Sequence, residues 1–200
     1  MVTRQPASAS KVAALVLAGG AGTRMGGGKL RRLWRGRPLV TWALEAALAS
    51  PTEAVWLVTG ADEALADLAP AEAGARLQTI HAGDWAHGLS ATLRAGIAAL
   101  PKDVGAVLIF LGDMPSIPMG GAEALVAAWR DGAVAAAPEF GGVRGHPALL
   151  DRSLFGEAMQ ATGDRGAGPL LAELGERLVL IPTLDDGVLF DVDTPQALEA

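Results

Sequence analysis

Val12-Ala-Ala-Leu-Val-Leu-Ala18 is followed directly by Gly19-Gly-Ala-Gly-Thr-Arg-Met-Gly-Gly-Gly-Lys29. A continuous apolar run of this length is typical of a strand that is buried on both faces of a parallel sheet. Glycines let the backbone turn its amide groups inward, and a nest of amides followed by fixed cations is what a triphosphate requires. The segment therefore predicts a buried strand that ends in a phosphate-binding loop.

Two commoner phosphate loops do not fit this segment. The dinucleotide-binding fingerprint would need a glycine where Met25 stands, and the P-loop would need serine or threonine where Leu30 follows Lys29. We expect a different type of loop, with Arg24 and Lys29 as its cations. The alternative is a flexible glycine loop that carries two solvated cations.

Apolar strands alternate with amphipathic helices along the rest of the chain. The pattern predicts an α/β fold, a single-domain Rossmann-like three-layer sandwich with a mostly parallel sheet and ligands at the carboxyl ends of its strands. Residues 1–10 are expected to be a disordered leader, residues 11–200 one domain, and 194–200 the start of a helix. Further strands are expected at 54–59, 77–80, 104–111, 134–137, 147–150 and 177–181, and helices at 38–50, 62–68, 89–100, 123–130, 151–160 and 168–175.

Composition narrows the class of partner. The formal net charge is −6 and there is no block of lysine and arginine, which argues against a nucleic-acid partner. The chain has no cysteine, so disulfides and thiolate metal sites are excluded and a cytoplasmic location is expected. The longest apolar stretches, 12–18 and 105–111, are too short to span a bilayer. We expect a small-molecule substrate and no membrane partner.

Two aspartates stand at separate strand ends. Asp113 lies in Gly112-Asp-Met-Pro115 after the strand at 104–111, and Asp193 lies in Phe190-Asp-Val-Asp-Thr-Pro195. Either one alone could be a turn or helix cap. Together with the phosphate loop, the pair predicts a Mg²⁺ site, because hard oxygen ligands hold magnesium against substrate phosphates. Asp191, two residues along the same predicted strand, is a weaker candidate for the outer shell of the metal.

Two further segments contain unusual residues. Gly88-Leu-Ser90 opens a predicted helix, whose free amides could meet a ribose or phosphate, although Ser90 as a plain helix cap remains equally open. Arg144-Gly-His146-Pro147 begins a predicted strand, and a lone histidine there is often structural.

The motifs together resemble a known family. Leu17-Ala-Gly-Gly-x-Gly-Thr-Arg-Met-Gly followed by Lys29 is similar to the signature of the MobA-like nucleotidyltransferases. Over residues 13 to 199, the chain resembles the molybdenum cofactor cytidylyltransferases of that family, which share the fold of the nucleotide-diphospho-sugar transferases. This likeness is carried by Gly88-Leu-Ser, Gly112-Asp-Met-Pro, Gly145-His-Pro, Gly163-Asp-Arg-Gly and Asp191-Val-Asp-Thr-Pro.

The resemblance implies a reaction and a set of site residues. CMP would pass from CTP to the terminal phosphate of molybdopterin, with release of pyrophosphate, and a molybdoenzyme or its chaperone would receive the product. Asp113 and Asp193 would hold Mg²⁺. The residues that would act in catalysis are Lys29, Arg24 and Asp113. The acceptor would be bound by Arg144 and His146. The nucleotide would contact Leu17, Ala18, Gly19, Gly20, Gly22, Thr23, Arg24, Lys29, Gly88, Ser90 and Asp113.

Two departures from the family pattern leave alternatives open. The loop reads Leu-Ala-Gly-Gly, which resembles the guanylyl-transferring relatives, whereas cytidylyl members tend to have Leu-Ala-Ala-Gly. Gly20 is the loop residue that favours a guanine nucleotide. Gly168 stands where relatives carry arginine. The alternatives are a guanylyltransferase, a transferase acting on a sugar 1-phosphate, and a non-catalytic nucleotide-binding accessory protein for molybdoenzyme maturation.

Overall fold

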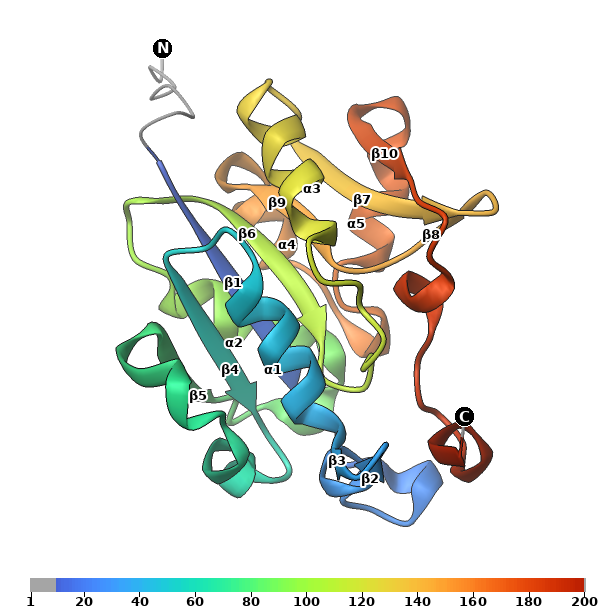
Figure 1. Cartoon of the computed structure of the whole chain (residues 1–200). Coiled ribbons are helices and arrows are strands. Elements are labelled where there is room, and N and C mark those ends of the chain that lie inside the picture. The colour runs from blue at the N-terminus through green and yellow to red at the C-terminus, as the bar shows by residue number, and fades with distance from the viewer. Residues whose placement is uncertain (1–9, 200) are drawn as a thin grey trace.

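The computed structural model describes residues 10–199, with the side chain of Arg24 left out. An eight-stranded sheet forms the centre of the molecule, in the order β10-β7-β9-β6-β1-β4-β5, with β8 paired to β7 (Figure 1). The strands are β1 (Lys11–Ala18), β4 (Ala54–Thr59), β5 (Leu77–His81), β6 (Val104–Leu111), β7 (Ala135–Phe140), β8 (Val143–Arg144), β9 (Ala148–Asp151) and β10 (Leu178–Pro182).

The sheet is mostly parallel, as the sequence predicts. β1 pairs in parallel with β4 on one side and with β6 on the other, and β5 and β10 extend the sheet in parallel at its two edges. β9 runs antiparallel to both β6 and β7. The carboxyl ends of β1, β4 and β6 therefore lie at one edge, which is the bottom of Figure 1.

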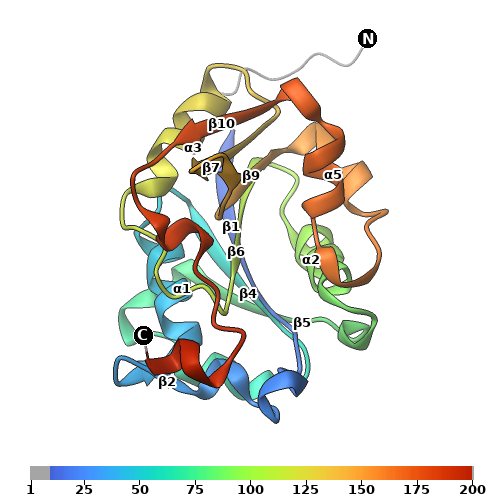
Figure 2. The same ribbon diagram turned by 90° about the vertical axis from the view of Figure 1, so that its right-hand side faces the viewer.

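Helices cover both faces of the sheet and make the predicted three layers. They are α1 (Leu39–Ala49), α2 (Leu89–Ala99), α3 (Gly121–Arg130), α4 (Phe155–Ala158) and α5 (Gly168–Glu173). Figure 2 shows α1 and α3 on one side of the sheet and α2 and α5 on the other.

Strand β1 contributes to both apolar layers. Val12, Ala14 and Val16 pack with α1 and α3, whereas Ala13, Leu15 and Leu17 pack with α2, α4 and α5. Because successive strand residues point to opposite faces, a strand between two helical layers must be apolar at every position. Leu15 is fully buried, and such a side chain contributes about 1.5–3 kcal/mol through its removal from water.

The structure corrects the sequence prediction in several places. Residues 190–193 form irregular backbone and no strand, so Asp191 and Asp193 are not related by strand periodicity. A short hairpin, β2 (Leu33–Trp34) with β3 (Arg37–Pro38), was not predicted. The closing segment forms a 3₁₀ helix at Pro195–Glu199. Residues 1–9 of the predicted leader, and residue 200, lie outside the described residues.

No helix within residues 10–199 is long and apolar enough to cross a membrane.

A buried hydrogen bond connects α3 to β9. The indole N–H of Trp129 donates to Asp151 at 2.7 Å, and both residues are buried. We expect Trp129→Phe to lower the free energy of unfolding by about 2 kcal/mol, because the buried carboxylate loses a donor. Urea unfolding measures the change. The loss should shrink in an Asp151→Asn background, and an equal loss in both backgrounds would show that packing, not this hydrogen bond, carries the effect.

Candidate active site

The ends of β1 and β6 bring the glycine loop and Asp113 to the same edge of the sheet. The backbone N–H of Gly112, just after β6, donates to the carbonyl of Leu17 near the end of β1 at 3.0 Å. Gly112 is buried in this contact. The hydrogen bond therefore fixes where the chain leaves β6, and Asp113 projects from that point beside the loop.

Gly22 shapes the loop between β1 and α1. Its φ is +63°, in the left-handed region that favours glycine. A Cβ at Gly22 would lie 2.6 Å from the Cβ of Lys29, a distance that such atoms do not reach. The backbone N–H of Gly27 also donates to the Gly22 carbonyl at 3.0 Å. Gly22 thus allows the loop to fold back until Lys29 lies against it.

The C-terminal segment places Asp193 beside Asp113. The N–H of Val192 donates to the carbonyl of Asp113 at 3.0 Å. The Val192 side chain is fully buried in a small apolar cluster with Met25, Trp34 and Leu39. Because this cluster includes the glycine loop, the hairpin and α1, burial of one valine docks the C-terminal segment against the site.

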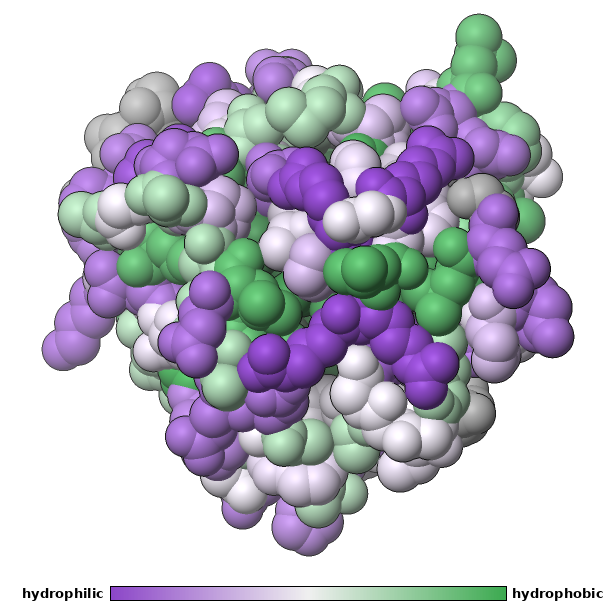
Figure 3. Space-filling view, turned by 60° about the horizontal axis from the view of Figure 1, so that its bottom comes forward, coloured by the Kyte–Doolittle hydropathy of each residue, from purple (hydrophilic) through white to green (hydrophobic). Residues whose placement is uncertain are grey.

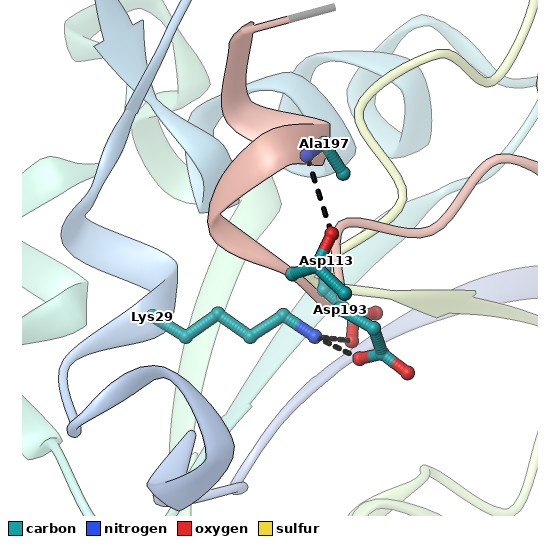
Figure 4. A network of polar contacts seen from close by, with 5 residues as sticks. Lys29, Asp113, Asp193 and Ala197 are labelled. Atoms are coloured by element: carbon teal, nitrogen blue, oxygen red, sulfur yellow. Dashed lines mark hydrogen bonds and ion pairs between the residues drawn. The ribbon is translucent and has the colours of Figure 1, made fainter.

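Lys29 bridges the two aspartates. Its Nζ lies 2.7 Å from Asp113 Oδ2 and 2.6 Å from Asp193 Oδ1 (Figure 4). The lysine side chain is only 10% exposed, against 28% for Asp113 and 46% for Asp193. Burial by itself lowers the pKa of Lys29, but the charges and hydrogen bonds of the two carboxylates outweigh it, and the pKa is raised above its ordinary value. Lys29 is therefore a fixed cation between two carboxylates.

Asp191 belongs to the same cluster, although no strand aligns it with Asp193. Burial of its carboxyl group raises the pKa of Asp191, and the charges of Asp193 and Asp113 raise it further. Asp191 thus lies close enough to Asp113 and Asp193 for their charges to disfavour its ionisation, while Lys29 pairs with those two carboxylates alone among the described contacts. Such a cluster favours an added cation.

The donor set of this cluster fits magnesium. Asp113 and Asp193 supply hard carboxylate oxygens, and Mg²⁺ in phosphoryl-transfer sites is usually held by one or two carboxylates, with waters and substrate phosphates completing the shell. Among the described residues there is no ready-made group of three or more histidine or carboxylate side chains that could hold a metal. The arrangement suits an ion that arrives with a phosphate ligand.

A cavity of about 480 Å³, here called the loop cavity, opens beside this cluster. The glycine loop forms one wall, the start of α2 another, and the three-residue turn before α2 a third. It is lined by Gly20, Ala21, Gly22, Thr23, Met25, Lys29, Trp85, Ala86, Gly88, Leu89, Asp113, Asp164 and Asp193. Figure 3 shows the face at the bottom of Figure 1, where an apolar band crosses a hollow between hydrophilic residues.

Most of the residues predicted to bind nucleotide converge here, but not all reach the cavity. Those that line the loop cavity are Gly20, Gly22, Thr23, Lys29, Gly88 and Asp113. Ala18 and Gly19 instead lie buried behind the loop. Leu17 lines a neighbouring cavity. The side chain of Arg24 lies outside the described part of the chain.

Ser90 is not a helix cap, which corrects that interpretation. Gly88 occupies the N-cap position of α2, and no side chain there makes a capping hydrogen bond. The Ser90 side chain is fully buried, and its hydroxyl has no hydrogen-bond partner within residues 10–199. Ser90 thus lies beneath the cavity wall that Gly88 and Leu89 form.

Sequence reasoning missed three residues around the loop cavity: Gly60, Trp85 and Asp164. A Cβ at Gly60 would lie 2.5 Å from both the Gly19 carbonyl oxygen and the Trp85 Cβ, so the end of β4 supports the loop from behind. The signal for Gly60 was its position directly after a predicted strand. Trp85 and Asp164 lie far from the loop in sequence. Asp164 belongs to the Gly163-Asp-Arg-Gly motif of the family resemblance, but that motif does not indicate by itself that Asp164 lines this cavity.

A second cavity of about 280 Å³, here called the arginine cavity, adjoins the first. Leu89 and Asp164 line both. Arg144 and His146, predicted to bind the acceptor, line the arginine cavity with Leu17, Ile109, Leu111, Ala148, Arg165, Gly166, Ala167, Gly168 and Leu171. The N–H of His146 donates to the Val188 carbonyl at 2.9 Å, which holds the start of this segment in place.

The fold and the site define a class of protein. A buried parallel strand leads into a glycine loop, and the loop cation meets two aspartates at the carboxyl edge of the sheet, which is the arrangement of an α/β domain that handles nucleoside phosphates. Residues 14–178 match the model of the MobA-like NTP transferase domain. The chain belongs to this family, so its reaction class is nucleotidyl transfer and its expected substrate a nucleoside triphosphate.

Solved structures share the fold. A homologue of Mycobacterium tuberculosis Rv0371c from Mycobacterium sp. strain JC1 is 26% identical, with a TM-score of 0.79 over 94% of this chain and 93% of that one. Rv0371c from M. tuberculosis, in complex with manganese, is 19% identical, with a TM-score of 0.75 over 96% and 100%. Molybdopterin-guanine dinucleotide biosynthesis protein A from Archaeoglobus fulgidus is 22% identical, with a TM-score of 0.64 over 94% and 95%. No curated protein sequence matches the chain.

The lysine bridge predicts how stability responds to divalent metal. We expect Lys29→Met to lower the free energy of unfolding by about 1–2 kcal/mol in EDTA, because the carboxylates lose their shared cation. Mg²⁺ should then raise the melting temperature of the variant more than that of the natural protein, since no lysine competes for the carboxylates. Thermal unfolding with and without Mg²⁺ measures both effects.

Lys11→Met is the matched control, because Lys11 forms an equally short ion pair with Asp103 at 2.6 Å in a half-exposed position away from the site. It should show little loss and no added response to Mg²⁺. Equal Mg²⁺ shifts in the natural protein and Lys29→Met would contradict competition at the carboxylates.

Proposed function

We propose that the protein transfers CMP from CTP to the terminal phosphate of a molybdopterin-type acceptor, releasing pyrophosphate and forming the cytosine dinucleotide form of the cofactor. The observation that carries this proposal is the position of Lys29 between Asp113 and Asp193, at the end of the glycine loop and beside two adjoining cavities. One cavity suits the triphosphate, and the other suits the acceptor.

The residues of the chain act mainly by positioning and by charge. The acceptor phosphate is already a nucleophile, so the reaction needs no covalent intermediate and no strong general base. Lys29 neutralises charge on the triphosphate, and the backbone amides of the glycine loop cradle its oxygens. When bound, Mg²⁺ would be held by Asp113 and Asp193 and would supply charge neutralisation at the phosphates.

Lys29 must change partners for this role. In the structure it is occupied by two carboxylates, and the incoming triphosphate offers a stronger anion at the same place. Transfer of Lys29 from carboxylates to phosphate would free Asp113 and Asp193 for a divalent cation. The M. tuberculosis neighbour with manganese supports a divalent cation in this fold.

The acceptor is proposed to enter through the arginine cavity. Arg144 and His146 line it, and it meets the loop cavity at Leu89 and Asp164. An acceptor held there would reach the bound nucleotide without crossing bulk solvent. The molybdopterin identity of the acceptor is supported by the motifs around His146 and by the A. fulgidus neighbour.

The loop glycines bear on which nucleotide base the protein accepts. Aligned from Leu17, the motifs Leu-Ala-Gly-Gly and Leu-Ala-Ala-Gly differ at Gly19 and are identical at Gly20, so Gly19 and not Gly20 is the residue that distinguishes them. A Cβ at Gly19 would lie 2.2 Å from Thr92 Oγ1, and Thr92 is almost fully buried in α2. Gly19 therefore has a packing reason to be glycine, and it carries little weight in favour of GTP.

Asp113→Asn should test the metal assignment. We expect the protein to fold, because Lys29 keeps its ion pair with Asp193, but to lose activity by about 100-fold or more, since a neutral amide is a poor ligand for Mg²⁺. Pyrophosphate release at low Mg²⁺ measures the loss. Asp103→Asn is the control, being exposed and remote from the cavities. Near-normal turnover of Asp113→Asn at low Mg²⁺ would overturn the metal role.

The base is tested by parallel assays with CTP and GTP in the presence of molybdenum cofactor and Mg²⁺. We expect kcat/KM for CTP to exceed that for GTP by about tenfold or more. Gly19→Ala combined with Thr92→Ala removes the clash and inserts the cytidylyl motif, with Thr92→Ala alone as its matched control. If Gly19 is a packing residue, the two variants should show the same ratio of kcat/KM for CTP to kcat/KM for GTP.

A clear preference for GTP would instead support the guanylyltransferase alternative and leave the reaction class intact. Nucleotide binding without pyrophosphate release under any of these conditions would support the accessory-protein alternative.

A further inference from the structure

Strand β10 lies at one edge of the sheet, and its outer side has no partner strand among the described residues. β10 pairs with β7 on its inner side, and β5 forms the opposite edge (Figure 1). The strand reads Leu178-Val-Leu-Ile-Pro182 and contains no charged residue. Val179 and Leu180 are 39% and 42% exposed. An open apolar edge of this kind is a template for pairing with another strand.

The opposite edge of the sheet has a different character. The exposed side chains of β5 are those of Gln78, Thr79 and His81, and His81 Nδ1 lies 3.5 Å from Glu63 Oε1. Polar and charged side chains protect an edge, because pairing with another strand would remove them from water. In β10 the only comparable feature is Pro182 at its end. The two edges of the sheet are therefore not equivalent, and β10 is the one suited to a partner.

The backbone of β10 directs hydrogen-bonding groups to its open side. In a parallel pair, alternate residues of a strand direct their N–H and C=O groups toward the same neighbour. The Thr183 N–H, just beyond the strand, donates to the Glu139 carbonyl of β7 at 2.9 Å. By this alternation, the N–H and C=O groups of Leu178 and Leu180 face away from β7. The carbonyl of Pro182 faces the same way, and proline has no N–H.

We propose that β10 binds a second copy of this chain, by pairing in antiparallel orientation with β10 of that copy about a two-fold axis at Leu180. In this register, Leu180 exchanges both of its backbone hydrogen bonds with Leu180 of the second copy, and the Leu178 N–H donates to the Pro182 carbonyl of that copy. Pro182 lies at the end of the ladder on an edge strand, where proline is tolerated. The inference goes beyond the proposed function, because β10 lines neither the loop cavity nor the arginine cavity.

The charges beside the strand favour the antiparallel arrangement. Glu176 and Arg177 precede β10 and balance each other, whereas Asp185 and Asp186 follow it. Antiparallel pairing brings Arg177 of each copy toward the aspartates of the other, whereas parallel pairing would set the aspartates of both copies side by side. Leu184, which is 100% exposed, adds apolar surface at the acidic end. A second copy thus matches this edge in hydrogen bonds, in apolar side chains and in charge.

Sedimentation of the full-length protein over a range of concentrations measures the assembly. We expect a reversible monomer–dimer equilibrium and no larger species, because two-fold pairing occupies the open edge. Leu180→Lys should raise the dissociation constant of the dimer by about tenfold or more, since it sets two lysines opposite each other and removes apolar contact. Thr79→Lys, at the centre of the other edge strand, is the matched control and should change nothing.

A mixture of Leu180→Lys and Leu180→Glu tests the register. Each variant alone should be largely monomeric, because like charges would meet at the two-fold axis. The mixture should form a one-to-one dimer, because opposite charges then face each other. The same pair of substitutions at Thr79 should leave the dissociation constant unchanged, whether the two variants are separate or mixed.

Single-cysteine variants give a second test that does not depend on weakened association, because the chain has no cysteine. Leu180→Cys should form an intermolecular disulfide under mild oxidation. The Cα atoms of a hydrogen-bonded antiparallel pair are about 5.5 Å apart, which a disulfide can bridge. Val179→Cys should crosslink much less, because Val179 lies opposite Ile181 of the second copy and about 7–8 Å from Val179 of that copy.

Three outcomes would overturn the inference. A protein that stays monomeric up to its limit of solubility would reject a second copy as the occupant of this edge. A dimer that Leu180→Lys does not weaken would place the interface on another surface. Equal crosslinking by Leu180→Cys and Val179→Cys would reject pairing about Leu180. None of these outcomes bears on nucleotidyl transfer, which pyrophosphate release measures separately.

Discussion

The ion pairs of Lys29 with Asp113 and Asp193 join three parts of the chain that the rest of the fold brings together. Lys29 lies at the end of the glycine loop, Asp113 follows β6, and Asp193 belongs to the irregular C-terminal segment. Each part has its own support: Gly22 shapes the loop, the Leu17 carbonyl holds the exit of β6, and the burial of Val192 docks the C-terminal segment. The sheet and its two helical layers supply the rigid frame on which these supports act.

The charges of the site are not balanced, and this imbalance suits the proposed nucleotidyl transfer. One lysine pairs with two carboxylates, so the free protein carries excess negative charge where a divalent cation would bind. The lining of the arginine cavity has the opposite imbalance, because it includes two arginines, Arg144 and Arg165, and one aspartate, Asp164. A metal-bound triphosphate and an anionic acceptor would each compensate one imbalance. The two ligands then meet beside Leu89 and Asp164, where the cavities join.

Several glycines in and around the glycine loop are required because neighbouring atoms leave no room for a side chain. A sequence motif alone does not distinguish this requirement from contact with a ligand. Gly19 lies against Thr92, and Gly60 lies against the loop itself. Gly88 adopts a φ of +97° and leaves room for Asp164, whose carboxylate lies 2.2 Å from where a Cβ would stand. These glycines let the backbone segments approach closely enough to form the cavity walls. Their effect on ligand binding is therefore indirect, through the shape of the loop cavity.

The sequence by itself determined the α/β class, the order of the main strands and helices, and the positions of the glycine loop and Asp113 directly after buried strands. It also indicated Asp193, but on a strand that the structure does not contain. These features are local: the periodicity of apolar residues reports burial, and a motif directly after a strand is placed by that strand. Only the tertiary structure decided that Lys29 pairs with carboxylates 84 and 164 residues away, that Gly60 supports the loop, and that Arg165 and Arg144 share a cavity. Local pattern could not reveal these contacts, because apolar burial specifies which face of an element is covered but not which polar side chains from distant segments then meet at its edge.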